Sequence, residues 1–137
     1  MAYLLDAGFL YSTLNRKEKF HGEAIEILVS IYEKVYFPVP AITEVAYLIL
    51  RDLGAQALAD FIESLAEMNV VFETPTAEDY RRAAEIIRKY DDANIDFVDA
   101  VIVAVAERLN ITKILTIDRR HFGIFKPRHC AAFEILP

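Results

Sequence analysis

Five acidic side chains stand in or beside apolar segments of the sequence, where a carboxylate is costly to bury. They are Asp6, Glu44, Asp96, Asp99 and Asp118. Asp99 is the sharpest signal, because it is the only polar side chain between Phe97 and Ala106. A helix that is apolar on every side is a buried helix. A buried carboxylate must be neutralised, hydrogen-bonded, paired or bound to a metal, so we expect Asp99 to have such a partner.

Two of the acids directly follow apolar runs that read as buried strands. Asp6 ends the run that begins at Tyr3, and Asp118 ends the run that begins at Lys113. In a parallel α/β sheet, ligands bind beyond the carboxyl ends of the strands. Either aspartate alone could simply open a turn or cap a helix. Two acids at strand ends together favour a shared site at one edge of the sheet.

The remaining two acids lie near the starts of expected helices. Asp96 precedes Asp99 by three residues, so both share one helical face near the positive N-terminus. A capping role would explain Asp96 equally well. Glu44 lies early in a very apolar helix, and no basic residue occurs between Lys34 and Arg51 to pair with it. A favourable interaction with the helix dipole is the alternative for Glu44.

Convergence of four or five carboxylates would require a cation. Carboxylates that share a site repel one another and are hard to ionise. Mg²⁺ and Mn²⁺ prefer oxygen ligands and retain several waters. One or two such ions, with water as nucleophile, support in-line attack on a phosphodiester. The acids therefore predict a magnesium or manganese site suited to phosphodiester hydrolysis.

The overall charge gives no broad attraction to nucleic acid. The 15 basic and 21 acidic residues leave a net charge of −6, so nucleic-acid chemistry needs a local basic patch or a bound cation. Arg16, Lys17 and Lys19, and also Arg119 and Arg120 beside the last acid, could contact phosphates. A solvated surface is the alternative for each of them.

Short strands that alternate with helices must position these acids. Strands are expected at 3–5, 35–37, 70–72, 113–117 and 132–136, and helices at 41–53, 56–68 and 95–109, with others from 23 and after 76. This alternation predicts an α/β fold with a central, mostly parallel sheet covered on both faces. At 137 residues, without a repeat or linker, the chain is expected to form a single domain over 1–137.

Composition constrains the partners and the cellular compartment. Hydrophobic residues make up 55%, which indicates either an apolar surface covered in an oligomer or a deeply buried sheet. No apolar run approaches the roughly 18 residues of a membrane span, and Met1–Asp6 is expected to be a strand, not a signal peptide. Cys130 is the only cysteine, which suits a reducing cytoplasm. The histidines His21, His121 and His129 show no ligand spacing, and no role in the site is expected for them.

The ordered set of motifs resembles a PIN domain, most closely the VapC-type ribonuclease toxins of prokaryotic toxin–antitoxin pairs. The matching segments are Leu4-Leu5-Asp6, Ile42-Thr43-Glu44-Val45, Asp96-Phe97-Val98-Asp99-Ala100 and Leu115-Thr116-Ile117-Asp118-Arg119-Arg120-His121-Phe122. The resemblance spans nearly the whole chain. It implies a three-layer α/β/α fold, metal-dependent cleavage of RNA, a homodimer, and inhibition by an antitoxin that covers the site.

The resemblance also implies roles for individual residues. Asp6, Glu44 and Asp99 would be the core metal ligands and catalytic residues, with Asp96 and Asp118 supporting the metal or its waters. This chain departs from the family by having Ala7-Gly8 where a hydroxyl or amide residue usually follows the first aspartate. That departure favours an alternative, a PIN-like module that binds RNA or protein without cutting. A phosphoryl-transfer domain of the haloacid-dehalogenase type is excluded, because Asp6-Ala7-Gly8 lacks the second aspartate.

Overall fold

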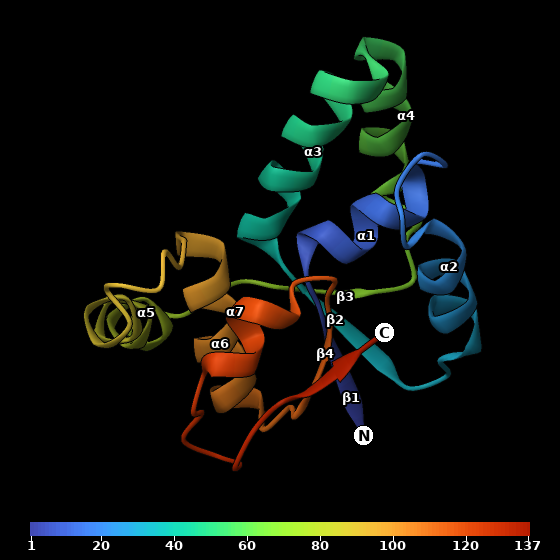
Figure 1. Ribbon diagram of the computed structural model, residues 1–137. Coiled ribbons are helices and arrows are strands. Elements are labelled where there is room, and N and C mark those ends of the chain that lie inside the picture. Colours follow the sequence, from blue (N-terminus) through green and yellow to red (C-terminus); the bar gives the residue numbers. More distant parts are fainter.

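The computed structural model describes residues 1–137 as five strands and seven helices (Figure 1). The strands are β1 (Ala2–Leu5), β2 (Lys34–Pro38), β3 (Val71–Glu73), β4 (Lys113–Leu115) and β5 (Glu134–Leu136). The helices are α1 (Ala7–Leu14), α2 (His21–Ser30), α3 (Val39–Leu53), α4 (Ala55–Ser64), α5 (Ala77–Lys89), α6 (Phe97–Leu109) and α7 (Arg119–Ile124). All strand pairings are parallel, in the order β3-β2-β1-β4-β5. The predicted α/β fold is confirmed.

The sheet is the middle of three layers, with a separate apolar core on each face. Side chains of β1 alternate between the cores: Tyr3 and Leu5 pack in the first, and Leu4 packs in the second. The first core is built with α1 to α4 and the second with α5 to α7, and Figure 1 shows these two groups of helices on opposite sides of the sheet. Both faces of the strands are buried, as is usual for a parallel sheet.

The direction of strand addition reverses between β1 and β4. From β1 the chain adds β2 and then β3 on one side, and later adds β4 and β5 on the other. Such a reversal leaves a crevice at the carboxyl ends of the two central strands. The backbone N–H of Asp6 donates to the carbonyl oxygen of Leu115 at 2.9 Å. This bond holds the ends of β1 and β4 together and places Asp6 at the mouth of the crevice.

Two helices were not predicted, and each begins directly after a strand-end aspartate. Helix α1 follows Asp6 and is so apolar that no clear periodicity marks it; five of its eight residues are buried. Helix α7 follows Asp118 and has only six residues. The long apolar helix was predicted correctly apart from its start, since α6 begins at Phe97 and not at Ile95. It ends at Asn110, whose left-handed conformation (φ 55°) terminates the helix.

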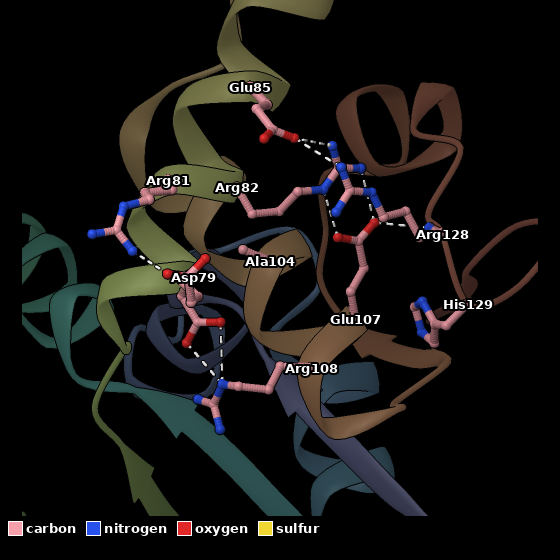
Figure 2. Close-up of a pocket in the computed structure, with 10 residues that line it drawn as sticks. Asp79, Arg81, Arg82, Glu85, Ala104, Glu107, Arg108, Arg128 and His129 are labelled. Carbon is pink, nitrogen blue, oxygen red and sulfur yellow. Dashed lines mark hydrogen bonds and ion pairs between the residues drawn. The ribbon is translucent and has the colours of Figure 1, made fainter.

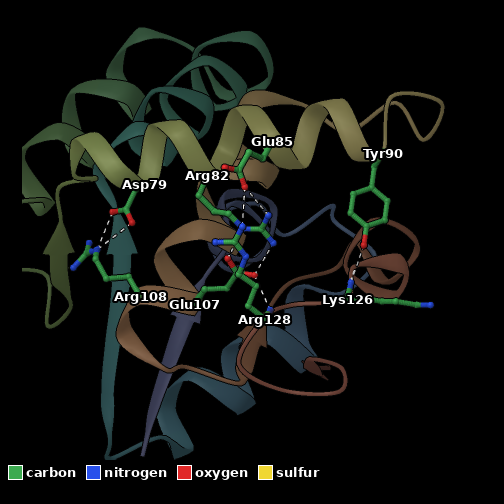
Figure 3. Close-up of polar contacts among 8 residues, drawn as sticks. All are labelled: Asp79, Arg82, Glu85, Tyr90, Glu107, Arg108, Lys126 and Arg128. Atoms are coloured by element: carbon green, nitrogen blue, oxygen red, sulfur yellow. Dashed lines mark hydrogen bonds and ion pairs between the residues drawn. The ribbon is translucent and has the colours of Figure 1, made fainter.

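Ion pairs between charged side chains fasten α5 to α6 on the second face of the sheet (Figure 3). Arg82 of α5 lies 2.7 Å from Glu107 of α6, and Arg108 of α6 lies 2.9 Å from Asp79 of α5. Asp79 is buried, and it also closes a capping box with Thr76 at the start of α5. These contacts orient α6, the helix that carries Asp99.

Several large apolar side chains are exposed on the other side of the molecule. Tyr47 and Leu50 of α3 are 64% and 51% exposed, and Ile62 of α4 is 56% exposed. Both explanations of the apolar composition therefore apply, a sheet buried on two faces and an uncovered apolar surface. None of the helices is long and apolar enough to cross a membrane.

Candidate active site

All five predicted acids line one cavity of about 390 Å³ at the end of the central strands. The complete lining is Asp6, Gly8, Glu44, Asp96, Asp99, Ile117, Asp118 and His121. The acids come from four places in the chain, namely the ends of β1 and β4, helix α3 and the start of α6. No lysine or arginine lines the cavity. The structure thus brings the five carboxylates together, as predicted.

Asp6 both caps a helix and faces the cavity, so the two interpretations of this residue are compatible. Its Oδ1 accepts the backbone N–H of Ala7 at 2.8 Å, and its Oδ2 accepts the hydroxyl of Thr116 at 2.7 Å. Burial raises the pKa of Asp6 from 3.8 to about 6; these two hydrogen bonds oppose the rise, and Asp118 and Asp96 add to it. The site therefore holds Asp6 rigidly and makes its ionisation unfavourable without a cation.

Asp96 and Asp99 both lie at the start of α6. Asp96 is the N-cap, and its Oδ1 accepts the backbone N–H of Asp99 at 2.9 Å. The capping role considered for Asp96 is therefore present, although the residue also lines the cavity. Asp99 is 7% exposed. Burial, followed by the negative charges of Asp96 and Asp6, raises the pKa of Asp99 well above its ordinary range.

Glu44 faces the cavity from the opposite group of helices. Helix α3 begins at Val39, two residues earlier than predicted, so Glu44 lies beyond its first turn. The helix dipole acts mainly on the first turn and gives little reason for an acid here. Burial, then the charges of Asp6 and Asp96, raises the pKa of Glu44 from 4.5 to about 7. The other acids of the cavity therefore disfavour the ionised form of Glu44.

Thr116 links the two strand-end aspartates, a role that was not predicted from the sequence. Its hydroxyl donates to Asp6, and its Oγ1 accepts the backbone N–H of Asp118 at 3.0 Å. Thr116 thus supplies a hydroxyl next to Asp6, where the segment Ala7-Gly8 has none. Ser12 does not replace it, because the Ser12 hydroxyl donates to the carbonyl of Gly8. The only feature of the sequence that could have indicated this role is the position of the threonine, two residues before Asp118.

His121 lies in the cavity, contrary to the expectation that the histidines have no part in the site. It follows Asp118 by three residues in α7, and its backbone N–H donates to Oδ1 of Asp118 at 3.0 Å. The Nδ1 atom lies 2.9 Å from Oδ2 of Asp118 and 3.3 Å from Oδ2 of Asp99. The expectation failed because α7 was not predicted; Asp118 is its N-cap, and the N-cap and the third residue of a helix lie close together.

None of the five predicted phosphate contacts lines the acidic cavity. Arg16 and Lys17 are exposed between α1 and α2, and Arg120 is exposed on α7. The guanidinium of Arg119 donates to the carbonyl oxygens of Ile135 and Pro137, so it points toward the carboxyl end of β5. Phosphate binding by these residues stays a prediction.

A second cavity of about 400 Å³ lies between α5, α6 and the segment near Arg128 (Figure 2). It is rich in charge, but its charges neutralise one another. Arg128 lies 2.8 Å from Glu85, and Arg82 lies 3.2 Å from the same carboxylate and 2.7 Å from Glu107. A paired network has little unsatisfied charge to offer a ligand. The acidic cavity is therefore the better candidate for chemistry.

The donor set of the acidic cavity fits a hard divalent cation. Its ligands are carboxylate oxygens, which Mg²⁺ and Mn²⁺ prefer. The pKa values of Asp6, Glu44 and Asp99 are all raised, with burial as the largest cause and neighbouring acids as the next raising influence. A bound cation would remove that repulsion. The buried Nδ1 of His121, which makes no hydrogen bond, is a further unsatisfied atom at the same place.

Comparison with known proteins agrees with this architecture. The family model "PIN domain" matches residues 3–124. Ribonuclease VapC26 of Mycobacterium tuberculosis is 28% identical over 134 residues, covering 98% of this chain and 99% of that protein. The crystal structure of M. tuberculosis VapC20, described as a toxin that cleaves the sarcin-ricin loop, has a TM-score of 0.76 at 24% identity, covering 82% of this chain and 86% of that one. VapBC2 of Rickettsia felis, solved on a promoter DNA fragment, has a TM-score of 0.70 at 14% identity over the full length of both chains.

Proposed function

We propose that this chain, which belongs to the PIN-domain family, is a metal-dependent endoribonuclease and the toxin of a toxin–antitoxin pair. The observation that carries the proposal is the convergence of five carboxylates on one cavity that no lysine or arginine enters. The full-length similarity to a protein named as a VapC ribonuclease supports RNA as the substrate. The expected cofactor is Mg²⁺ or Mn²⁺.

The acids divide into three ligands and two supporting residues. Asp6, Glu44 and Asp99 are proposed to hold the metal directly, because their anions are the most in need of a cation. Asp96 and Asp118 are proposed to bind the metal or to orient its waters. When bound, the metal would activate water for attack on the phosphodiester and stabilise the leaving oxygen. The hydroxyl of Thr116 and the backbone N–H of Ala7 fix both oxygens of Asp6 for this purpose.

The RNA backbone needs positive groups outside the acidic cavity. Arg16 and Lys17 on the exposed segment before α2, and Arg119 and Arg120 at the start of α7, are proposed to contact phosphates on either side of the scissile bond. With a net charge of −6, the metal itself is expected to provide much of the local attraction.

A cognate antitoxin is the proposed regulator. Solved neighbours of this fold include a toxin–antitoxin complex from Klebsiella pneumoniae (TM-score 0.68, 16% identity). The exposed apolar side chains of α3 and α4 suit a protein partner, which is proposed to be the antitoxin or a second copy in a homodimer. Because cellular RNA is the proposed substrate, the cytoplasm is the proposed location. Sedimentation equilibrium of the purified chain would report whether it is a dimer.

The competing function is a PIN-like module that binds RNA or protein without cutting. Ala7-Gly8 favoured this alternative, since the usual polar residue is missing there. The hydroxyl of Thr116 on Asp6 weakens that objection. Five acids gathered without a cation would also be a costly arrangement for a module that has no use for a metal.

The deciding experiment is cleavage of a mixed RNA pool in Mn²⁺ by the wild type and by Asp6→Asn. Asp79→Asn is the matched control, because Asp79 is also a buried helix-capping aspartate but lies on α5 outside the acidic cavity. We expect the wild type and Asp79→Asn to cleave, and both Asp6→Asn and added chelator to abolish cleavage. Metal binding without cleavage of any RNA would support the binding module, and absence of metal binding would refute the proposed function.

A further inference from the structure

The imidazole of His121 is in an unusual electrostatic position. Its Nδ1 atom lies 2.9 Å from a carboxylate oxygen of Asp118 and 3.3 Å from one of Asp99. The atom is buried and has no hydrogen-bond partner, although both oxygens lie close to it. A buried polar atom without a partner is rare in proteins and calls for an explanation. The position suggests that a bound ion or ligand occupies the space between these three atoms.

The spacing of the three atoms is that of ligands around one ion. The ligand atoms of Asp99, Asp118 and His121 all lie within 4.8 Å of one another. Two ligands at right angles, each ~2.1 Å from an octahedral cation, are separated by roughly 3 Å. The two distances from Nδ1 have this size. A cation would also satisfy the Nδ1 lone pair and both carboxylates together, which a hydrogen bond in the observed geometry does not.

We propose that Nδ1 of His121 is a metal ligand, together with Asp99 and Asp118, and that it shifts the preference of the site from Mg²⁺ toward Mn²⁺. This inference rests on the proposed metal-dependent function and deepens it. Mg²⁺ takes oxygen ligands almost exclusively. An imidazole nitrogen binds transition ions better than it binds Mg²⁺, and affinity for nitrogen-containing sites rises along the series that begins with Mn²⁺.

Local hydrogen bonds hold the three proposed ligands in place. Asp118 caps α7 by accepting the backbone N–H of His121, so the carboxylate and the imidazole are held by the same turn. Asp99 is held from the other side by its backbone hydrogen bond to Asp96. The three donors therefore come from two helix N-termini whose capping bonds fix their relative positions. Such preorganisation is what a metal site requires.

The first test is pulsed electron paramagnetic resonance of Mn²⁺ bound to the wild-type protein, with natural-abundance and ¹⁵N-histidine-labelled samples. A histidine ligand gives a nitrogen coupling that changes on labelling, and this readout does not depend on RNA cleavage. We expect the coupling in the wild type and in His129→Asn, and its loss in His121→Asn. His129 is the matched control, because its Nδ1 is also buried without a partner but lies outside the acidic cavity.

Calorimetric titration with each metal is the second test. We expect His121→Asn to weaken Mn²⁺ binding on the order of 10-fold and Mg²⁺ binding less than about 3-fold, whereas His129→Asn should change neither. Mn²⁺ bound by the wild type with no histidine coupling would overturn the inference but leave the proposed function standing; His121 would then be a counter-charge to the acids. Failure of the wild type to bind either metal would overturn both.

Discussion

Replacing Asp6 by asparagine is predicted to destroy the metal site and yet to stabilise the metal-free protein at neutral pH. Asp6 is 6% exposed and no cation contacts it. Asparagine has nearly the same shape, keeps an oxygen to accept the N–H of Ala7, and carries no charge. The substitution therefore removes the electrostatic cost of an anion that the fold places beside other acids.

The size of the effect follows from the pKa of Asp6. A rise from 3.8 to about 6 corresponds to a penalty of about 3 kcal/mol for the ionised form in the folded state. Asparagine would turn its NH₂ toward Thr116 and leave that hydroxyl without an acceptor, which costs about 1 kcal/mol. The net gain of about 2 kcal/mol should raise the Tm by roughly 7 °C for a chain of this size.

The predicted gain depends on pH with a definite sign. Below pH 3.8 the carboxyl of Asp6 is protonated in both the folded and the unfolded protein, so no penalty exists. Between pH 3.8 and about 6 the unfolded state ionises first, and the wild type loses stability as the pH rises. Above about pH 6 the penalty is complete. The advantage of Asp6→Asn should therefore be full at pH 7.5 and absent at pH 4.

The assay is thermal unfolding in chelator at pH 7.5 and pH 4, followed by the same measurement in Mn²⁺. Asp79→Asn serves as the control, because Asp79 is similarly buried but lies 2.9 Å from Arg108; losing this ion pair should lower stability by roughly 1.5–3 kcal/mol. In Mn²⁺ at 100 times its Kd, the wild type should gain about 2.7 kcal/mol and overtake Asp6→Asn. A Tm of Asp6→Asn at or below that of the wild type at pH 7.5 without metal would refute the reasoning.

Three further predictions concern carboxyl groups inside and outside the acidic cavity. Asp99→Asn should abolish RNA cleavage while keeping or raising the Tm in chelator, because burial and three nearby acids disfavour its anion; a clear drop in the metal-free Tm would mean that Asp99 is a structural partner. The affinity for Mn²⁺ should rise between about pH 5.5 and 8. Burial raises the pKa of Asp6 to about 6 and that of Glu44 to about 7, and both carboxyls must lose their protons when the metal binds. Calorimetry in buffers of different ionisation enthalpy would detect the released protons. Glu107→Gln should lower the free energy of unfolding by roughly 1.5–3 kcal/mol, because it breaks the ion pair with Arg82. Denaturant unfolding would measure this loss of stability. Unchanged RNA cleavage by the same variant would show that the acidic cavity is not affected.

The sequence by itself determined the layered α/β architecture and the identity of the acids. Strand-end acids such as Asp6 and Asp118 can be recognised locally, because an apolar run that stops at an aspartate is a short-range pattern. Asp99 was equally visible, since a lone carboxylate in an apolar helix is costly wherever that helix packs. These inferences needed only nearest neighbours and the alternation of strands with helices.

Only the tertiary structure decided which atoms meet at the site. The hydroxyl of Thr116 reaches Asp6 across 110 residues of chain, and this contact depends on β4 lying beside β1. His121 enters the cavity because α7 forms directly after Asp118, and a helix of six residues leaves too weak a periodic signal to predict. Hydrogen-bond partners and unsatisfied atoms arise from long-range packing, which a pattern of residue types along one chain does not encode locally.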